Sequence, residues 1–138
     1  MNGVEWIVEA HGCSAAALRD PALLRQLFDR LIHDLKLRPV APVQWHQFPQ
    51  TSGITGLCLL SESHLACHSF PEFQSLCLNV FCCVPRAAWE FETNLKQMFG
   101  ASAVSVRQLV RPYMSLDTRR RADGPALAAA LAQEEPRG

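Results

Sequence analysis

The chain lacks the features that mark membrane, secreted and nucleic-acid-binding proteins. None of its apolar runs reaches the roughly 18 residues of a membrane-spanning helix, and its start has neither the basic nor the long apolar region of a signal peptide. Its 13 basic and 13 acidic side chains cancel, which leaves no broad basic surface for nucleic acid. We therefore expect a cytoplasmic protein with no membrane or nucleic-acid partner. The run Arg119-Arg120-Arg121 is interpreted as a solvated patch.

Paired cysteine motifs are also missing. The six cysteines include no CxxC pair of the kind found in zinc sites. Most of them lie in apolar runs, where a free thiol behaves as a small hydrophobic side chain: Cys58, Cys67, Cys77, Cys82 and Cys83. Without an export signal, disulfides are not expected. The sequence predicts reduced thiols and favours the absence of a metal site.

Two amphipathic helices are present in the pattern. Asp20-Pro21 has an N-capping carboxylate followed by proline at the first helical position, and leucines then recur at three- and four-residue spacing up to Leu35. A second helix is predicted from Pro85 to Phe99, with Gly100 as its C-terminal stop. A third, short helix is predicted for 126–133, within a tail from 113 to 138 that is expected to be partly helical or disordered.

Short runs rich in strand formers separate these helices. They span Val4–Ala10, Val43–Phe48, Ile54–Leu60, His64–Phe70, Ser75–Cys83 and Ser102–Val110. Helices separated by groups of strands favour an α+β fold. We predict one domain over 1–112, a two-layer αβ sandwich whose antiparallel sheet is covered by two main helices.

The stretch 61–72 is the least ordinary part of the chain. It places Ser, Glu, His and Cys between two apolar strands, although polar groups in a core are costly unless they are hydrogen-bonded. Alternation along strands would bring both histidines, a serine hydroxyl and a thiol together if the strands are neighbours. Three interpretations remain open at this point: a metal site of His64, His68 and cysteines, a Ser–His or Cys–His nucleophile, and satisfied core residues without chemistry.

The longer motif Ser61-Glu62-Ser63-His64-Leu65-x-x-His68-Ser69-Phe70-Pro71-Glu72, followed by Val80-Phe81-x-Cys83, resembles the prokaryotic-type S-adenosylmethionine decarboxylases. These are self-cleaving, pyruvoyl-dependent enzymes of spermidine synthesis. The likeness extends to Gly53-Ile54-Thr55-Gly56 and His46-x-Phe48, and more loosely to the N-terminal strand and first helix.

The resemblance implies a role for several residues. Ser63 would attack the carbonyl of Glu62, the chain would break between positions 62 and 63, and a pyruvoyl cofactor would remain at the new N-terminus. His68 would assist this processing, with support from the hydroxyl of Thr55. Cys83 would be the general acid that protonates the decarboxylated carbon. The substrate-binding residues would be Phe48, Phe70 and Glu72. The family also pairs as homodimers with active sites built from both protomers.

Some positions depart from the family pattern. Asn79 and Cys82 stand where relatives usually have aspartate and threonine, and Val84-Pro85 replaces a Gly-Asp-like turn. The N-terminal Gly-x-His element reads Gly3-Val4-Glu5. S-adenosylmethionine is the leading substrate, and a basic amino acid such as arginine or ornithine is the alternative. A non-catalytic homologue that acts as a binding or regulatory subunit is a further alternative.

Overall fold

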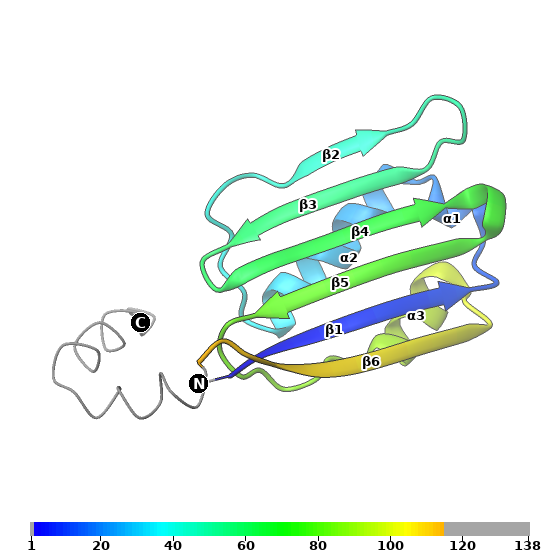
Figure 1. The fold of residues 1–138 in the computed structure, drawn as a ribbon. Coiled ribbons are helices and arrows are strands. Elements are labelled where there is room, and N and C mark those ends of the chain that lie inside the picture. The colour runs from blue at the N-terminus through cyan, green and yellow to red at the C-terminus, as the bar shows by residue number, and fades with distance from the viewer. Residues whose placement is uncertain (1, 115–138) are drawn as a thin grey trace, which may run out of the picture.

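One antiparallel sheet of six strands organises residues 2–114, the part of the chain that the computed structural model describes (Figure 1). The strands are β1 (Asn2–His11), β2 (Gln44–Gln47), β3 (Ile54–Leu60), β4 (Ser63–Phe70), β5 (Ser75–Cys82) and β6 (Ala103–Pro112). They lie in the order β2-β3-β4-β5-β1-β6, and each neighbouring pair is antiparallel. The predicted fold is confirmed, with strand ends shifted by one or two residues. The helix predicted for 126–133 lies outside the described residues.

The helices cover one face of this sheet (Figure 1). They are the short α1 (Ala15–Leu18), α2 (Pro21–Asp34), α3 (Phe91–Phe99) and a 3₁₀ turn, η1 (Pro71–Phe73). Helix α2 begins as predicted, because the Asp20 carboxylate accepts a hydrogen bond from the backbone N–H of Ala22 at 3.0 Å. Helix α3 ends as predicted, with Gly100 in the left-handed conformation at φ 70°.

The predicted start of the second main helix at Pro85 is wrong. Helix α3 begins at Phe91, and residues 85–90 are not helical. The side chains in this segment make tertiary contacts instead: Trp89 Nε1 donates a hydrogen bond to Asp34 Oδ2 at 2.8 Å, and Arg86 pairs with Glu62. These contacts keep the segment from continuing α3 towards the N-terminus, because tertiary packing overrides local helix propensity.

The core lies between the covered face of the sheet and the helices. Trp6 and Val8 of β1 and Leu65 of β4 are buried there against Phe28 and Leu31 of α2, all at 1% exposure or less. The other face has no helix over it in the described part of the chain (Figure 1). Leu57 and Leu59 on that open face are 49% and 63% exposed.

Because α2 packs into this core, shortening one of its buried side chains should lower the stability of the fold strongly. Leu31→Ala removes a fully buried side chain and leaves a cavity, so we expect the free energy of unfolding to fall by about 3 kcal/mol in chemical denaturation. Gln26→Ala, at an exposed position on the same helix, is the matched control and should change it by less than about 0.5 kcal/mol. Equal effects would contradict the assigned core.

Candidate active site

The register of β4 and β5 brings Ser63 and Cys83 together. Ser63 pairs with Cys82, so Cys83 lies one residue beyond the end of β5 and beside Ser63. The Ser63 Oγ and Cys83 Sγ atoms are 2.7 Å apart. The backbone N–H of Cys83 donates a 2.7 Å hydrogen bond to the carbonyl oxygen of Glu62. A hydroxyl, a thiol and a polarised carbonyl therefore meet at one peptide bond.

The backbone at this bond is strained. Ser63 has φ 145°, a conformation that residues with a side chain rarely adopt and that costs about 1–3 kcal/mol. It directly follows the tight turn Ser61-Glu62 that joins β3 to β4. The pairing of Ser63 with β5 on one side and with Leu60 of β3 on the other holds it in place. Backbone strain of this kind is found most often at functional sites.

Glu62 is buried and its carboxylate is fully engaged. Glu62 is 8% exposed. Its Oε1 accepts from the backbone N–H of Arg38 at 3.2 Å and lies 3.5 Å from Arg86 Nη2, and its Oε2 accepts from the Ser61 hydroxyl. These contacts fix the residue whose carbonyl faces Ser63.

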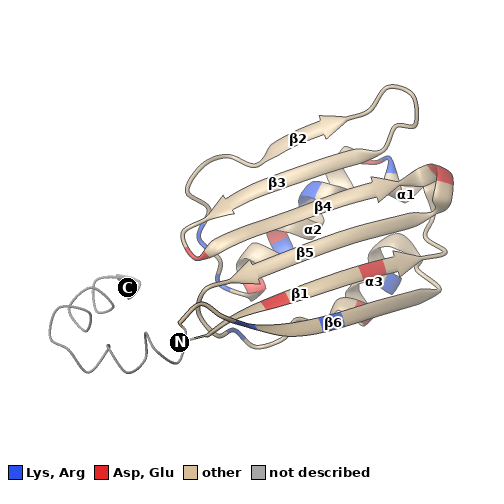
Figure 2. Cartoon of the chain, viewed as in Figure 1, with Lys and Arg blue, Asp and Glu red and all other residues tan. Residues whose placement is uncertain are grey.

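A polar network crosses the open face from β4 to β6. His64 Nε2 donates to Asn79 Oδ1 at 2.5 Å, and Asn79 Nδ2 donates to Glu5 Oε2 at 2.8 Å. Glu5 forms an ion pair with Arg111, whose guanidinium lies 5.5 Å from the centre of the Phe81 ring. The hydrogen bond from Asn79 and the charge of Arg111 hold the pKa of Glu5 below its usual range, although burial opposes this. Acidic positions on β1 and basic positions on β6 lie side by side in Figure 2.

Two positions at which the sequence is expected to depart from the family pattern, 5 and 79, meet in this network. Asn79 presents an amide on β5, and the neighbouring strand β1 supplies a carboxylate at Glu5. Sequence reasoning did not single out Glu5 as a candidate site residue. The two departures, at 5 and at 79, are the signal that could have found it, because both positions face the same side of adjacent strands.

The other site residues predicted from the sequence lie at the far end of β4. Thr55 Oγ1 and His68 Nδ1 are 3.0 Å apart. Both line a pocket of about 280 Å³ together with Phe48, Phe70 and Glu72. The five-residue separation of His68 from Ser63 along an extended strand corresponds to ~17 Å. The hypothesis that both histidines, a serine and a thiol converge is therefore wrong within one chain.

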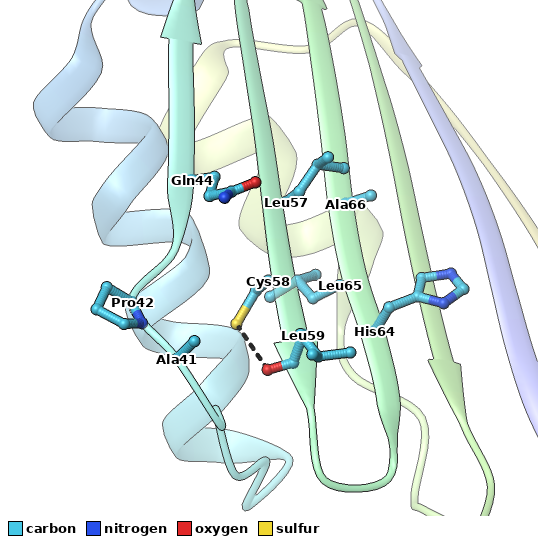
Figure 3. Close-up of a pocket in the computed structure, with 9 residues that line it drawn as sticks. All are labelled: Ala41, Pro42, Gln44, Leu57, Cys58, Leu59, His64, Leu65 and Ala66. Carbon is cyan, nitrogen blue, oxygen red and sulfur yellow. Dashed lines mark hydrogen bonds between the residues drawn. The ribbon is translucent and has the colours of Figure 1, made fainter.

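A larger, mostly apolar pocket lies on the open face between β2, β3 and β4 (Figure 3). Its volume is about 400 Å³, and its walls include Ala41, Pro42, Leu57 and Leu59. His64 is at its edge and extends toward β5, where Asn79 holds the imidazole (Figure 3). An apolar hollow beside an exposed leucine pair is typical of a surface that another molecule covers.

Four of the six cysteines are buried, and Cys77 and Cys83 are partly exposed. All six are free. Burial raises the pKa of Cys67 to about 12 and, with smaller contributions from neighbouring charges, that of Cys82 to about 11. These two thiols stay protonated and unreactive and pack in the core as small apolar side chains, as the sequence indicates. In residues 2–114, no cluster of three or more His, Cys, Asp or Glu side chains is arranged to hold a metal ion. None of the helices described in this range is both long and apolar enough to span a membrane.

Comparison with known proteins gives the same assignment as the motif. Residues 4–112 match the family described as S-adenosylmethionine decarboxylase. The chain is 32% identical over 112 residues to the S-adenosylmethionine decarboxylase proenzyme of Carboxydothermus hydrogenoformans, covering 78% of this chain and 84% of the relative. It is 34% identical over 110 residues to proenzyme 2 of Halalkalibacterium halodurans, covering 76% and 82%.

A solved structure has the same fold. The adenosylmethionine decarboxylase of Aquifex aeolicus superposes with a TM-score of 0.70 at 20% identity, over 83% of this chain and 93% of that one. At this identity the likeness supports the fold alone, and the sequence matches carry the family assignment. The chain thus belongs to the S-adenosylmethionine decarboxylase family of carboxy-lyases, as the motif around Ser63 predicts.

Proposed function

We propose that this chain is a self-processing, pyruvoyl-dependent decarboxylase that acts on S-adenosylmethionine. The observation that carries the proposal is the geometry at one peptide bond: Ser63 is strained, its hydroxyl lies against Cys83, and the Glu62 carbonyl accepts the Cys83 N–H. The relatives named as proenzymes support the idea that the chain is made as a precursor.

The residues around Ser63 are suited to breaking the chain. The Ser63 hydroxyl oxygen adds to the Glu62 carbonyl carbon, and the Cys83 N–H stabilises the negative charge that develops on the carbonyl oxygen. Loss of the amide bond to nitrogen gives an ester between Glu62 and the Ser63 side chain. Elimination then removes Glu62 as a carboxylate. The remaining enamine tautomerises to an imine, and water releases ammonia to give the pyruvoyl group.

The pyruvoyl group would supply the electron sink that decarboxylation needs, from the protein's own atoms. The Cys83 thiol, already beside position 63, is placed to deliver a proton to the substrate carbon. Phe48 and Phe70 are 44% and 37% exposed on the pocket that also contains Glu72. Aromatic faces and a carboxylate suit a substrate that carries a sulfonium cation.

The split between the two ends of β4 supports a homodimer with shared sites. Ser63 and Cys83 lie at one end, and Thr55, His68 and the aromatic pocket lie at the other. A two-fold axis near Ala66, the middle of β4, that lies between two facing sheets and perpendicular to the strand would bring the Ser63 end of one protomer onto the His68 end of its partner. The exposed leucines and apolar pocket of the open face would be buried by the same contact.

The proposal extends to pathway and compartment. Decarboxylated S-adenosylmethionine is the aminopropyl donor for spermidine synthesis in this family, and we assign this chain the same role. A thiol that acts as an acid must stay reduced, which fits a cytoplasmic location. Arginine and ornithine are the substrates to compare with S-adenosylmethionine in the first assays.

The first prediction from the proposed function concerns the intact mass of the purified protein. We expect two fragments, residues 1–62 and 63–138, the second without a free amino group. Ser63→Ala removes the nucleophile, so it should leave a single chain and no decarboxylase activity. Activity in the uncut variant would contradict the pyruvoyl hypothesis. An uncut wild-type chain that stays stable would favour a non-catalytic homologue.

The second prediction separates processing from turnover. In Cys83→Ala the backbone N–H that faces Glu62 remains, while the thiol is lost. We expect cleavage to continue at a reduced rate, and kcat of the cleaved protein to fall by about 10²–10⁴-fold. Cys82→Ala, which removes a neighbouring thiol from the buried face, is the control. Unchanged turnover in Cys83→Ala would remove this residue from the acid role.

The third prediction tests the shared site by complementation. Ser63→Ala and His68→Ala should each be inactive alone. Half of randomly mixed dimers are hybrids with one intact site of two, so co-expression should restore about a quarter of wild-type activity. Ser63→Ala co-expressed with Cys83→Ala is the control and should restore far less, because both residues lie in the same half-site of one chain. The opposite pattern would contradict the two-protomer arrangement.

A further inference from the structure

The segment between β5 and α3 places an arginine beside the side chain of Glu62, the residue that precedes Ser63. Arg86 follows Val84-Pro85, and its Nη2 atom lies 3.5 Å from Glu62 Oε1. The Arg86 side chain is 25% exposed and that of Glu62 is 9% exposed. Arg86 Nε is buried and has no hydrogen-bond partner among the described residues. The guanidinium therefore contacts Glu62 through Nη2 and carries a further donor, Nε, that no described residue uses.

The positive charge of Arg86 matters because the carboxylate of Glu62 is buried. The Arg38 backbone N–H and the Ser61 hydroxyl, both neutral, also contact the Glu62 carboxylate. Among the contacts found for this carboxylate, Arg86 supplies the positive charge. A buried carboxylate without a compensating charge is costly, and a second one on the same residue would be more so.

The proposed processing reaction creates such a second carboxylate. When the ester between Glu62 and Ser63 eliminates, the bond between the Ser63 Cβ and the ester oxygen breaks. The electron pair of that bond stays on the oxygen, and the α-proton of Ser63 is removed by a base. Glu62 then ends the first fragment and carries both its side-chain carboxylate and a new main-chain carboxylate. The negative charge on Glu62 doubles in this step.

We propose that Arg86 is a positioning residue for the elimination step. It neutralises the Glu62 side chain in the precursor, and its unused Nε–H takes the main-chain carboxylate as it forms. The preceding ester-forming step moves negative charge onto the Glu62 carbonyl oxygen, and this oxygen already accepts a hydrogen bond from the Cys83 N–H. Arg86 therefore acts mainly on the second step, and its loss should let the ester accumulate. This inference rests on the proposed function.

The amount of ester can be measured, and it would not rise if Arg86 only stabilised the fold. The ester has the same mass as the precursor, but hydroxylamine cleaves it into a 1–62 hydroxamate and a fragment that begins with a free Ser63 amine. The elimination product instead begins with a pyruvoyl group and has no such amine. Freshly purified or newly translated full-length chain is quenched with hydroxylamine at successive times, and both species are followed by mass spectrometry.

We expect Arg86→Gln to slow the disappearance of the ester at least tenfold and to raise the hydroxylamine-sensitive fraction. Arg86→Lys, which keeps the charge, should recover part of the rate. Arg25→Gln, at an exposed position on α2, is the matched control and should process like the wild type. Circular dichroism of each variant checks that it is folded.

Three outcomes would overturn the inference. Arg86→Gln could process at the wild-type rate, or it could lose cleavage with no ester detected, which would mean a structural role. Arg86→Lys could also be as slow as Arg86→Gln, which would exclude charge as the cause. A wild-type chain that never forms fragments is a different result, because it removes the proposed function and this inference together.

Discussion

The hydrogen bond from the Cys83 N–H to the Glu62 carbonyl depends on how β4 and β5 are aligned. Because Ser63 pairs with Cys82, the chain leaves β5 at the point where it can reach back to the β3–β4 turn. A shift of one residue would move Cys83 away and reverse the face of every side chain on the strand. The buried alternation of β5, with Leu76, Leu78 and Val80 in the core, fixes that alignment. Core packing therefore sets the position of the reactive groups.

The sheet is covered on one side only, and this explains where the chemistry lies. Helices α2 and α3 bury one face, so the polar residues of the strands gather on the other. There they form two separate groups, one from His64 to Arg111 and one from Thr55 to His68. Each group is completed by hydrogen bonds, yet neither holds all the residues that the family motif contains. The motif runs along one strand, so the proposed site that uses all of it would need two copies of that strand.

Much of the fold could be predicted from local patterns. The N-cap Asp20 with Pro21 marked the start of α2, and Gly100 marked the end of α3, because both residues satisfy helix ends through their own chemistry. The strands were found because apolar runs bounded by turn residues are short and distinct. The start of α3 was not found, because contacts of Arg86 and Trp89 with distant residues decide it.

The site was predicted in part. The motif identified Ser63 and Cys83, and the structure brings them into contact. The motif also contained His68, but strand alternation suggested a convergence with Ser63 that strand length forbids. Glu5 and Arg86 were missed because their partners, Asn79 and Glu62, are 74 and 24 residues away in the chain. Pairings of this kind follow from sheet order, which local sequence patterns do not contain.

The order of the strands has one more consequence for a chain cut at the β3–β4 turn. The first fragment would contain β1, β2 and β3, and the second would contain β4, β5 and β6. In the sheet, however, β1 lies between β5 and β6. The two fragments would be interleaved through three ladders, β3 with β4, β1 with β5 and β1 with β6. They would remain associated after the covalent link is lost. Their unfolding, however, would release two separate chains, so the stability of the cut protein would depend on its concentration in a way that the stability of the uncut chain does not.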